Sequence, residues 1–253
     1  MLTFGSLFAG IGGFDLGFER AGLVCRWQVE IDPFCRGVLE KHWPHVRRHD
    51  DVRTFPPRPI KEWKTDVICG GFPCQDISNV GKRAGISGSR SRLWYEFARC
   101  LRVLRPRFAV VENVAALSHR GLDRVLGDLA EIGYDAEWST LSACALGAPH
   151  TRARLFVVAH AADQSRQRLW STIASACEKE RDLCRWPNQP EPLRVADGVP
   201  RRMDRIRALG NAVVPQVAEL IERALIAVDA ADRKTLTRNQ KHRRRTRERS
   251  RVS

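Results

Sequence analysis

The chain has 253 residues, of which 43% are hydrophobic, so it is long enough for one α/β domain and a smaller unit. It lacks an apolar run of about 18 residues and a basic N-terminal segment followed by an apolar one. A membrane span and a signal peptide are therefore disfavoured, and a cytoplasmic location is expected. The formal net charge of +14 favours a polyanionic partner.

Apolar runs and helical periodicities alternate along the first part of the chain. Buried strands are predicted at 2–8, 23–29, 66–69, 108–111 and 155–159, and helices at 14–21, 93–104 and 121–132. A glycine turn at 9–13 follows the first strand, and a short element leads to Asp50-Asp51-Val52. Strands that alternate with helices predict a doubly wound, mostly parallel α/β sheet.

The pattern changes at about residue 161. Residues 161–199 are polar and contain Trp170, Trp186 and three prolines, which predicts a small irregular segment. Regular structure is expected to return at Pro215, where an apolar stripe with helical spacing begins. Residues 232–253 hold ten Lys and Arg against two acidic residues. Such a tail is expected to be disordered, and acts either as a solubilising segment or as an arm that binds phosphates without sequence choice.

The eight cysteines include one in a distinctive position. None forms a Cys-x-x-Cys pair or precedes paired histidines at finger spacing, so no metal site is expected and most are expected to be buried free thiols. Cys74 differs because an apolar run precedes it, in the sequence Gly70-Gly71-Phe72-Pro73-Cys74-Gln75. A thiol on a tight turn after a strand is suited to nucleophilic attack if its pKa lies below the ordinary ~8.5.

Other polar residues also follow predicted strands, where doubly wound sheets bind ligands. The sequence Phe8-Ala9-Gly10-Ile11-Gly12, with Glu30 twenty positions after Gly10, is a nucleotide-type fingerprint in which the acid binds ribose hydroxyls. Asp15 replaces the third glycine, which disfavours a pyrophosphate and favours a nucleoside without one. A purely structural glycine turn is the alternative interpretation.

Two further acidic residues have alternative interpretations. Asp51 is in a position to reach an adenine amino group, but a helix cap or a solvated turn is the better explanation for this residue alone. Glu112 ends a predicted buried strand. It either hydrogen-bonds a heterocycle and helps to protonate a ring nitrogen, or pairs with an arginine.

Five motifs carry a resemblance to DNA (cytosine-5)-methyltransferases over residues 2–160 and 195–228. They are Phe8-Ala9-Gly10-Ile11-Gly12-Gly13, Gly71-Phe72-Pro73-Cys74-Gln75, Glu112-Asn113-Val114, Thr151-Arg152-Ala153-Arg154 and Gly210-Asn211-Ala212-Val213-Val214-Pro215. The Pro-Cys-Gln and Glu-Asn-Val elements, in this order and each after a buried strand, are the most specific. The resemblance implies an S-adenosylmethionine-dependent, Rossmann-like methyltransferase fold.

The resemblance also implies a mechanism. Cys74 attacks carbon 6 of a cytosine flipped out of the duplex, while Glu112 holds the ring nitrogen and the exocyclic amine. Arg154 contacts the exocyclic oxygen and Arg152 braces the site. Carbon 5 takes the methyl group, and loss of its proton then expels Cys74. The implied cofactor contacts are Phe8, Ala9, Gly10, Ile11, Gly12, Glu30, Ile31, Asp51, Val52, Pro73, Asn211 and Ala212.

The same resemblance divides the chain into parts. Residues 1–160 are expected to form the catalytic domain, 161–199 a short target-recognition region, and 200–231 a segment that returns to the catalytic domain before the basic tail. The expected partner is double-stranded DNA, bound by a monomer. A cognate restriction endonuclease is a further candidate partner, and restriction-modification or phage DNA protection is the expected role.

Three departures from the family pattern matter. His150 stands where the family has Gln before its arginine pair, the recognition region is short, and the basic tail is not part of the family core. The sequence therefore leaves two alternatives, a tRNA cytosine-5 methyltransferase of the same fold and a catalytically decayed DNA-binding relative. Methyl transfer to duplex DNA, compared with transfer to tRNA, distinguishes the three.

Overall fold

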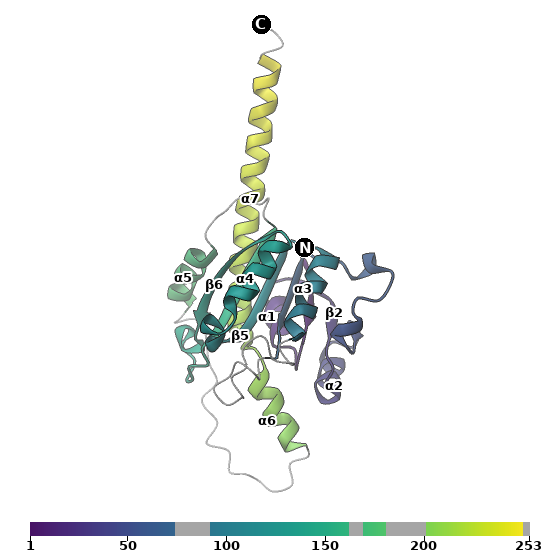
Figure 1. Cartoon of the computed structure of the whole chain (residues 1–253). Coiled ribbons are helices and arrows are strands. Elements are labelled where there is room, and N and C mark those ends of the chain that lie inside the picture. The colour runs from purple at the N-terminus through teal and green to yellow at the C-terminus, as the bar shows by residue number, and fades with distance from the viewer. Residues whose placement is uncertain (74–91, 162–168, 181–200, 250–253) are drawn as a thin grey trace.

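The computed structural model describes residues 1–73, 92–161, 169–180 and 201–249, which form a sheet with helices on both faces (Figure 1). The strands are β1 (Thr3–Leu7), β2 (Val24–Val29), β3 (Arg47–His49), β4 (Val67–Gly71), β5 (Phe108–Val114), β6 (Tyr134–Leu141) and β7 (Arg154–Ala161). Their order in the sheet is β3-β2-β1-β4-β5-β7-β6. All neighbours from β3 to β5 pair in parallel, whereas β7 is antiparallel to both β5 and β6. The predicted mostly parallel sheet is confirmed.

Side chains of the strands alternate between two hydrophobic cores. In β4, Ile68 packs into one core and Val67 and Cys69 into the other, and all three are fully buried. The helices are α1 (Gly13–Arg20), α2 (Pro33–His42), α3 (Arg92–Leu104), α4 (Leu122–Glu131), α5 (Leu169–Glu180), α6 (Arg202–Asn211) and α7 (Pro215–Arg249). Helices α3 and α4 contribute to the first core, and α1, α5 and α7 to the second. Because both faces are covered, the central strands are continuous apolar runs that the sequence reveals.

Helix α2 was not predicted, although it has a clear N-terminal signal. The Asp32 side chain accepts hydrogen bonds from the backbone N–H groups of Phe34 and Cys35, at 2.8 and 3.3 Å. Pro33 occupies the first helical position, where its missing N–H would have no intrahelical partner. The helix therefore begins immediately beyond Glu30, at the carboxyl end of β2.

Three other elements also escaped prediction: β6, α5 and α6. Strand β6 lies at the edge of the sheet and carries mostly half-exposed side chains, so it has no apolar run. Helix α5 lies within 161–199, where an irregular segment was expected. The structure corrects that expectation for 169–180, because Leu169 and Ile173, one helical turn apart, are buried in the second core. Residues 162–168 and 181–199 lie outside the described part of the chain.

Helix α7 is longer than the stripe that predicted it. The stripe residues Val217, Leu220, Ile221, Ala224, Leu225 and Val228 are all buried. The helical backbone then continues to Arg249, where a disordered tail was expected from Asp232. A segment rich in helix-favouring Arg and Lys that follows an already packed helix needs no new nucleation, which explains the difference. In the described part of the chain, no helix, α7 included, has the length and apolar character that a membrane crossing requires.

Two carboxyl groups lie in the core between the sheet and helices α1 and α7. Asp15 accepts hydrogen bonds from Ser6 Oγ at 2.8 Å and from Gln28 Nε2 at 3.0 Å. Glu222 is fully buried, and neither of its carboxyl oxygens has a hydrogen-bond partner within the described residues. Burial raises the pKa of Glu222 to about 8, so the folded protein favours the neutral acid at neutral pH.

The free energy of unfolding is therefore expected to depend on the ionisation of Glu222. Its folded-state pKa of about 8 exceeds the ordinary 4.5, so stability falls as the pH rises between these values. Glu222→Gln should match the wild type near pH 5 and exceed its stability by about 2–4 kcal/mol near pH 8.5. Denaturant unfolding at both pH values measures this. Glu219→Gln is the matched control, because this side chain lies on the same helix, is partly exposed and pairs with Arg223. A wild-type protein that is the more stable one near pH 8.5 would contradict the prediction.

Candidate active site

The glycine turn after β1 is held by Glu30 at the carboxyl end of β2. The Glu30 carboxylate accepts hydrogen bonds from the backbone N–H groups of Gly10 at 2.7 Å and Asp32 at 2.8 Å. Gly10 has a φ of 57°, and a Cβ atom there would meet nothing within 4 Å, so open space faces the turn. Burial raises the pKa of Glu30, and the two backbone donors oppose that shift. The turn and the acid that the fingerprint pairs in sequence are therefore in direct contact.

Apolar side chains border the same turn. Phe8 has a positive φ of 54°, and its ring stacks on that of Phe97 in α3, with the centroids 6.4 Å apart. Ile31 directly follows Glu30 and is 61% exposed, which is unusual for a large aliphatic side chain. Ala9 donates its backbone N–H to the carbonyl of Val29 at 3.0 Å and so fixes the start of the turn on β2. The turn thus presents apolar surface beside a carboxylate.

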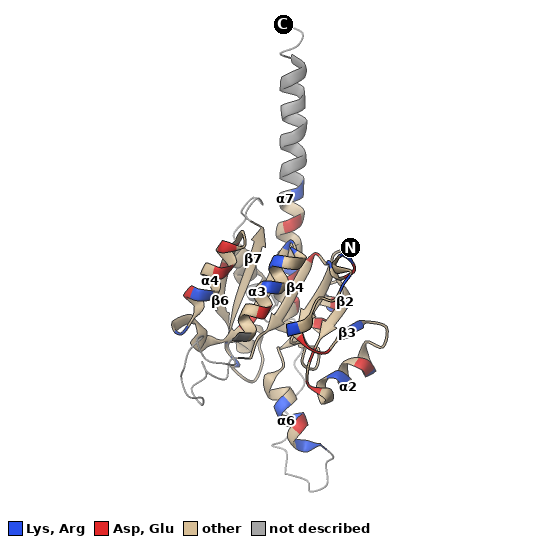
Figure 2. Ribbon diagram, turned by 45° about the vertical axis from the view of Figure 1, so that its right-hand side comes forward, with Lys and Arg blue, Asp and Glu red and all other residues tan. Residues whose placement is uncertain are grey.

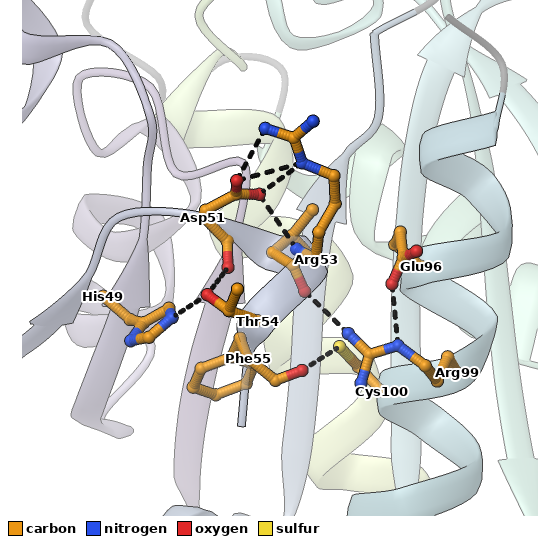
Figure 3. A network of polar contacts seen from close by, with 9 residues as sticks. His49, Asp51, Arg53, Thr54, Phe55, Glu96, Arg99 and Cys100 are labelled. Atoms are coloured by element: carbon orange, nitrogen blue, oxygen red, sulfur yellow. Dashed lines mark hydrogen bonds and ion pairs between the residues drawn. The ribbon is translucent and has the colours of Figure 1, made fainter. Parts of the chain in front are cut away.

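Asp51 has the capping role that the sequence offered as its alternative (Figure 3). It caps the 3-10 helix η1 (Val52–Thr54) by accepting from the backbone N–H of Arg53 at 3.0 Å. Both carboxylate oxygens also accept from the Arg53 guanidinium at 2.6 to 2.9 Å, which lowers the pKa of Asp51. Val52 is buried, and its carbonyl accepts from Arg99 Nη2 at 2.7 Å, so the turn is tied to α3. A role for Asp51 toward an adenine amino group stays a prediction.

Glu112 lies inside β5, because pairing with β7 extends that strand to Val114. Its partner in β4 is Gly71, where a Cβ atom would lie 2.5 Å from Glu112 Oε2, so the glycine leaves room for the carboxyl group. Arg154 Nε lies 3.1 Å from Glu112 Oε1. Burial raises the pKa of Glu112 to about 7, although Arg154 and Arg152 oppose that shift. A carboxyl group with this pKa exchanges a proton readily near neutral pH.

The chain that leaves β4 toward Cys74 is attached to β5. Asn113 donates from Nδ2 to the carbonyl of Phe72 at 3.1 Å, and both residues are buried. Pro73, the next residue, is exposed. Cys74 itself lies outside the described residues, so its position relative to Glu112 stays a prediction.

Arg152 holds the segment between α6 and α7. Its Nη2 donates to the carbonyl of Gly210 at 2.9 Å and also to the carbonyl of Ala212. Arg152 has a φ of 32°, a left-handed conformation that is rare outside glycine and is retained here by these contacts. Asn211, the last residue of α6, is exposed between the two bonded carbonyls. The two arginines of the motif therefore have different partners, since Arg154 binds Glu112.

A cavity of about 790 Å³ borders the glycine turn. Its lining includes Ile11 and Gly12 of the turn, Trp43 after α2, and Leu209 and Ala212 at the end of α6. The acidic residues Glu30, Asp51 and Glu112 are not among the residues that line this cavity. The cavity thus borders the predicted cofactor residues Ile11, Gly12 and Ala212 and the predicted catalytic residue Arg152.

The predicted residues fall into three contacting groups along the carboxyl edge of the sheet. The first joins Gly10 to Glu30, the second joins Gly71, Glu112 and Arg154, and the third joins Arg152 to 210–212. Sequence reasoning missed Asp32, which binds both Glu30 and α6. The Asp32-Pro33 pair before a helical stretch is the signal that would have revealed it.

The model of the C-5 cytosine-specific DNA methylase family matches residues 2–191. This chain belongs to that family. The Type II methyltransferase M2.BsuMI of Bacillus subtilis is 33% identical over 162 residues, which cover 61% of this chain and 41% of that protein. The Type II methyltransferase M.FnuDI of Fusobacterium nucleatum is 36% identical over 157 residues, which cover 60% of this chain and 45% of that protein.

Solved structures show the same fold. A protein described as a DNA modification methyltransferase encoded within an E. coli prophage is 27% identical, with a TM-score of 0.56, and the match covers 66% of this chain and 49% of that protein. The Dnmt2 methyltransferase of S. pombe is 18% identical with a TM-score of 0.57, over 68% of this chain and 55% of that one. This chain spans less than half the length of the two curated relatives.

Proposed function

We propose that this protein transfers a methyl group from S-adenosylmethionine to carbon 5 of cytosine in double-stranded DNA. The observation that carries the proposal is the buried Glu112 carboxyl group, which pairs with Arg154 and has a pKa of about 7. An acid with these properties suits a heterocycle that must gain and lose a proton at its ring nitrogen. Family membership supplies the reaction class.

The residues around the glycine turn fit S-adenosylmethionine. A carboxylate accepts roughly four hydrogen bonds, and two of those of Glu30 are used by backbone donors, which leaves capacity for two ribose hydroxyls. The open space over Gly10 gives the ligand a close approach, and Ile31 and Phe8 offer apolar surface for adenine. The bound cofactor supplies an electrophilic methyl group. Asp51, Val52, Pro73, Asn211 and Ala212 are proposed as further contacts.

The remaining steps belong to this chain's own residues. The Cys74 thiolate forms a bond to carbon 6 of the flipped cytosine, while Glu112 hydrogen-bonds the ring nitrogen and stabilises the charge that develops there. The electron pair of the former 5,6 double bond would form the bond from carbon 5 to the methyl group, and the donor's sulfur–methyl bond would break to leave a neutral thioether. Transfer of the carbon 5 proton to a water molecule then restores the double bond and releases the thiolate. Arg154 keeps the Glu112 carboxyl group in place throughout these steps.

The cysteine adduct provides a direct test of the proposed function. Bisulfite sequencing of DNA from cells that express the protein identifies the methylated site. A duplex with 5-fluorocytosine at that site should then trap a denaturant-stable protein–DNA complex in the presence of S-adenosylmethionine, because fluorine cannot leave as a proton does. Transfer to tRNA without transfer to duplex DNA would favour the tRNA alternative. The absence of any transfer would indicate a decayed relative.

The biological role is proposed from the relatives. A Type II methyltransferase protects host DNA beside a cognate restriction endonuclease, and a phage enzyme protects phage DNA. The site found by bisulfite sequencing distinguishes these roles when it is compared with the endonuclease activities of the host.

A further inference from the structure

Helix α6 is fixed to the carboxyl edge of the sheet at two points. Arg207 Nη2 lies 2.9 Å from Asp32 Oδ2, at the N-terminus of α2. At the C-terminal end of the helix, the Arg152 guanidinium donates to the carbonyls of Gly210 and Ala212, where the negative end of the helix dipole favours a cation. These contacts join α6 to both the Glu30 group and the arginine motif. The helix is therefore held in a defined orientation over the candidate site.

One face of α6 combines arginine with exposed aliphatic side chains. Residues Arg202, Arg205, Ile206 and Leu209 have the i, i+3, i+4, i+7 spacing of one helix face. Ile206 is 52% exposed, and Leu209, which also borders the cavity described above, is 65% exposed, whereas Ala208 is buried. These four residues are called the outer face of α6. Large aliphatic groups exposed next to one another mark an interaction surface.

The charge of this helix selects the kind of partner. Residues 201–207 hold four arginines and one aspartate, and Figure 2 shows α6 standing out from the body of the protein. Guanidinium groups bind phosphates, and aliphatic side chains make contacts to sugars and to bases next to a distorted step. A duplex from which one base is flipped out offers both kinds of contact.

The position of α6 also favours DNA. In Figure 1, α6 lies beyond the end of the sheet that is remote from the N-terminus, which is the carboxyl edge. That edge carries Glu30, Glu112 and Arg154. Helix α7 begins at this edge, where Pro215 borders the cavity, and its Arg- and Lys-rich part (residues 233–249) extends past the opposite edge. Of these two basic segments, only α6 therefore lies beside the candidate site.

We propose that the outer face of α6 binds the DNA duplex next to the target cytosine. Arg202 and Arg205 bind phosphates, and Ile206 and Leu209 make apolar contacts to the strand that carries the flipped base. The proposal rests on the proposed function and adds the surface that binds the substrate. It also gives a chain with a short recognition region a second element for holding DNA.

The salt dependence of DNA binding tests the arginines. Fluorescence anisotropy with a duplex that contains the methylated site, over about 50–300 mM salt, gives the slope of log affinity against log salt. The double variant Arg202→Gln/Arg205→Gln should reduce this slope by about 2 and weaken binding about tenfold at intermediate salt. The matched control Arg20→Gln/Arg102→Gln removes the same charge in the last turns of α1 and α3, at the opposite edge of the sheet. It should leave the slope unchanged, and calorimetry should give unchanged S-adenosylmethionine affinity for both variants.

Three results would overturn the proposal. One is a wild-type protein without affinity for the duplex, and another is an unchanged slope in the α6 variant. The third concerns the variant Ile206→Glu/Leu209→Glu. If light scattering shows that the wild type is a dimer and this variant a monomer, while DNA affinity stays the same, the outer face binds a second copy of this chain. Under the proposal, this variant stays monomeric and loses at least about tenfold in DNA affinity. Since binding is measured without methyl transfer, failure of transfer contradicts the proposed function separately.

Discussion

Replacing Cys74 by alanine is expected to abolish methyl transfer to cytosine and to leave the affinity for S-adenosylmethionine within about twofold of the wild type. The nucleophile forms the bond that makes carbon 5 reactive, and removal of a nucleophile lowers kcat by about 10⁴-fold or more. The proposed cofactor contacts belong to a different group of residues around Gly10 and Glu30. Single-turnover transfer of a labelled methyl group measures the first effect, and calorimetry measures the second.

Cys144→Ala is the matched control for that experiment. Cys144 is an exposed thiol, and it lies in none of the three contacting groups of the candidate site. This variant should transfer methyl groups at the wild-type rate. Substantial turnover by Cys74→Ala, or no denaturant-stable adduct on 5-fluorocytosine with the wild type, would mean that another group is the nucleophile. Loss of cofactor binding in Cys74→Ala would instead point to a structural role.

The sequence predicts the central part of this fold well because that part is buried on both sides. Strands such as β4 and β5 are unbroken apolar runs, and the stripe of α7 has a clear period. Edge elements lack this signal. In β6, half-exposed polar side chains alternate along the strand, and α6 has only Ala208 buried. The structure of β6 and α6 depends on contacts with residues that are distant in the sequence.

The candidate site divides in the same way. The Gly10–Glu30 contact follows from a motif whose spacing brings two strand ends together, so the sequence predicts it. Arg152 binds the carbonyls of Gly210 and Ala212, which lie 58 and 60 residues further along the chain. No local sequence pattern reveals this contact. For Asp51, local chemistry predicts the helix cap, and the neighbouring Arg53 also binds its carboxylate, while a role toward adenine stays a prediction.

Glu112→Gln is expected to lower kcat/KM by about 10²–10⁴-fold and to change its dependence on pH. The pKa of Glu112 is raised to about 7, so the protonated form that hydrogen-bonds the ring nitrogen is lost as the pH rises through that value. The wild-type rate should therefore have a limb that falls above about pH 7, in addition to the rise due to ionisation of the Cys74 thiol. Glutamine keeps a hydrogen-bond donor but has no proton to transfer, so the falling limb should disappear. Steady-state rates from about pH 5.5 to 9 measure this.

Arg154→Gln distinguishes the ionisation of Glu112 from that of any other group. Burial raises the pKa of Glu112 and the Arg154 charge opposes the shift, so removing that charge should raise the pKa further. The falling limb of the Arg154→Gln variant should then move to higher pH, while the limb of Glu112→Gln stays absent. A limb that keeps its position in both variants would belong to a different residue, and Glu112 would then act as a hydrogen-bonding group without proton transfer. Burial and the Arg154 charge shift the pKa of Glu112 in opposite directions. Substitutions at Glu112 and at Arg154 therefore test whether the falling limb of the pH profile belongs to Glu112.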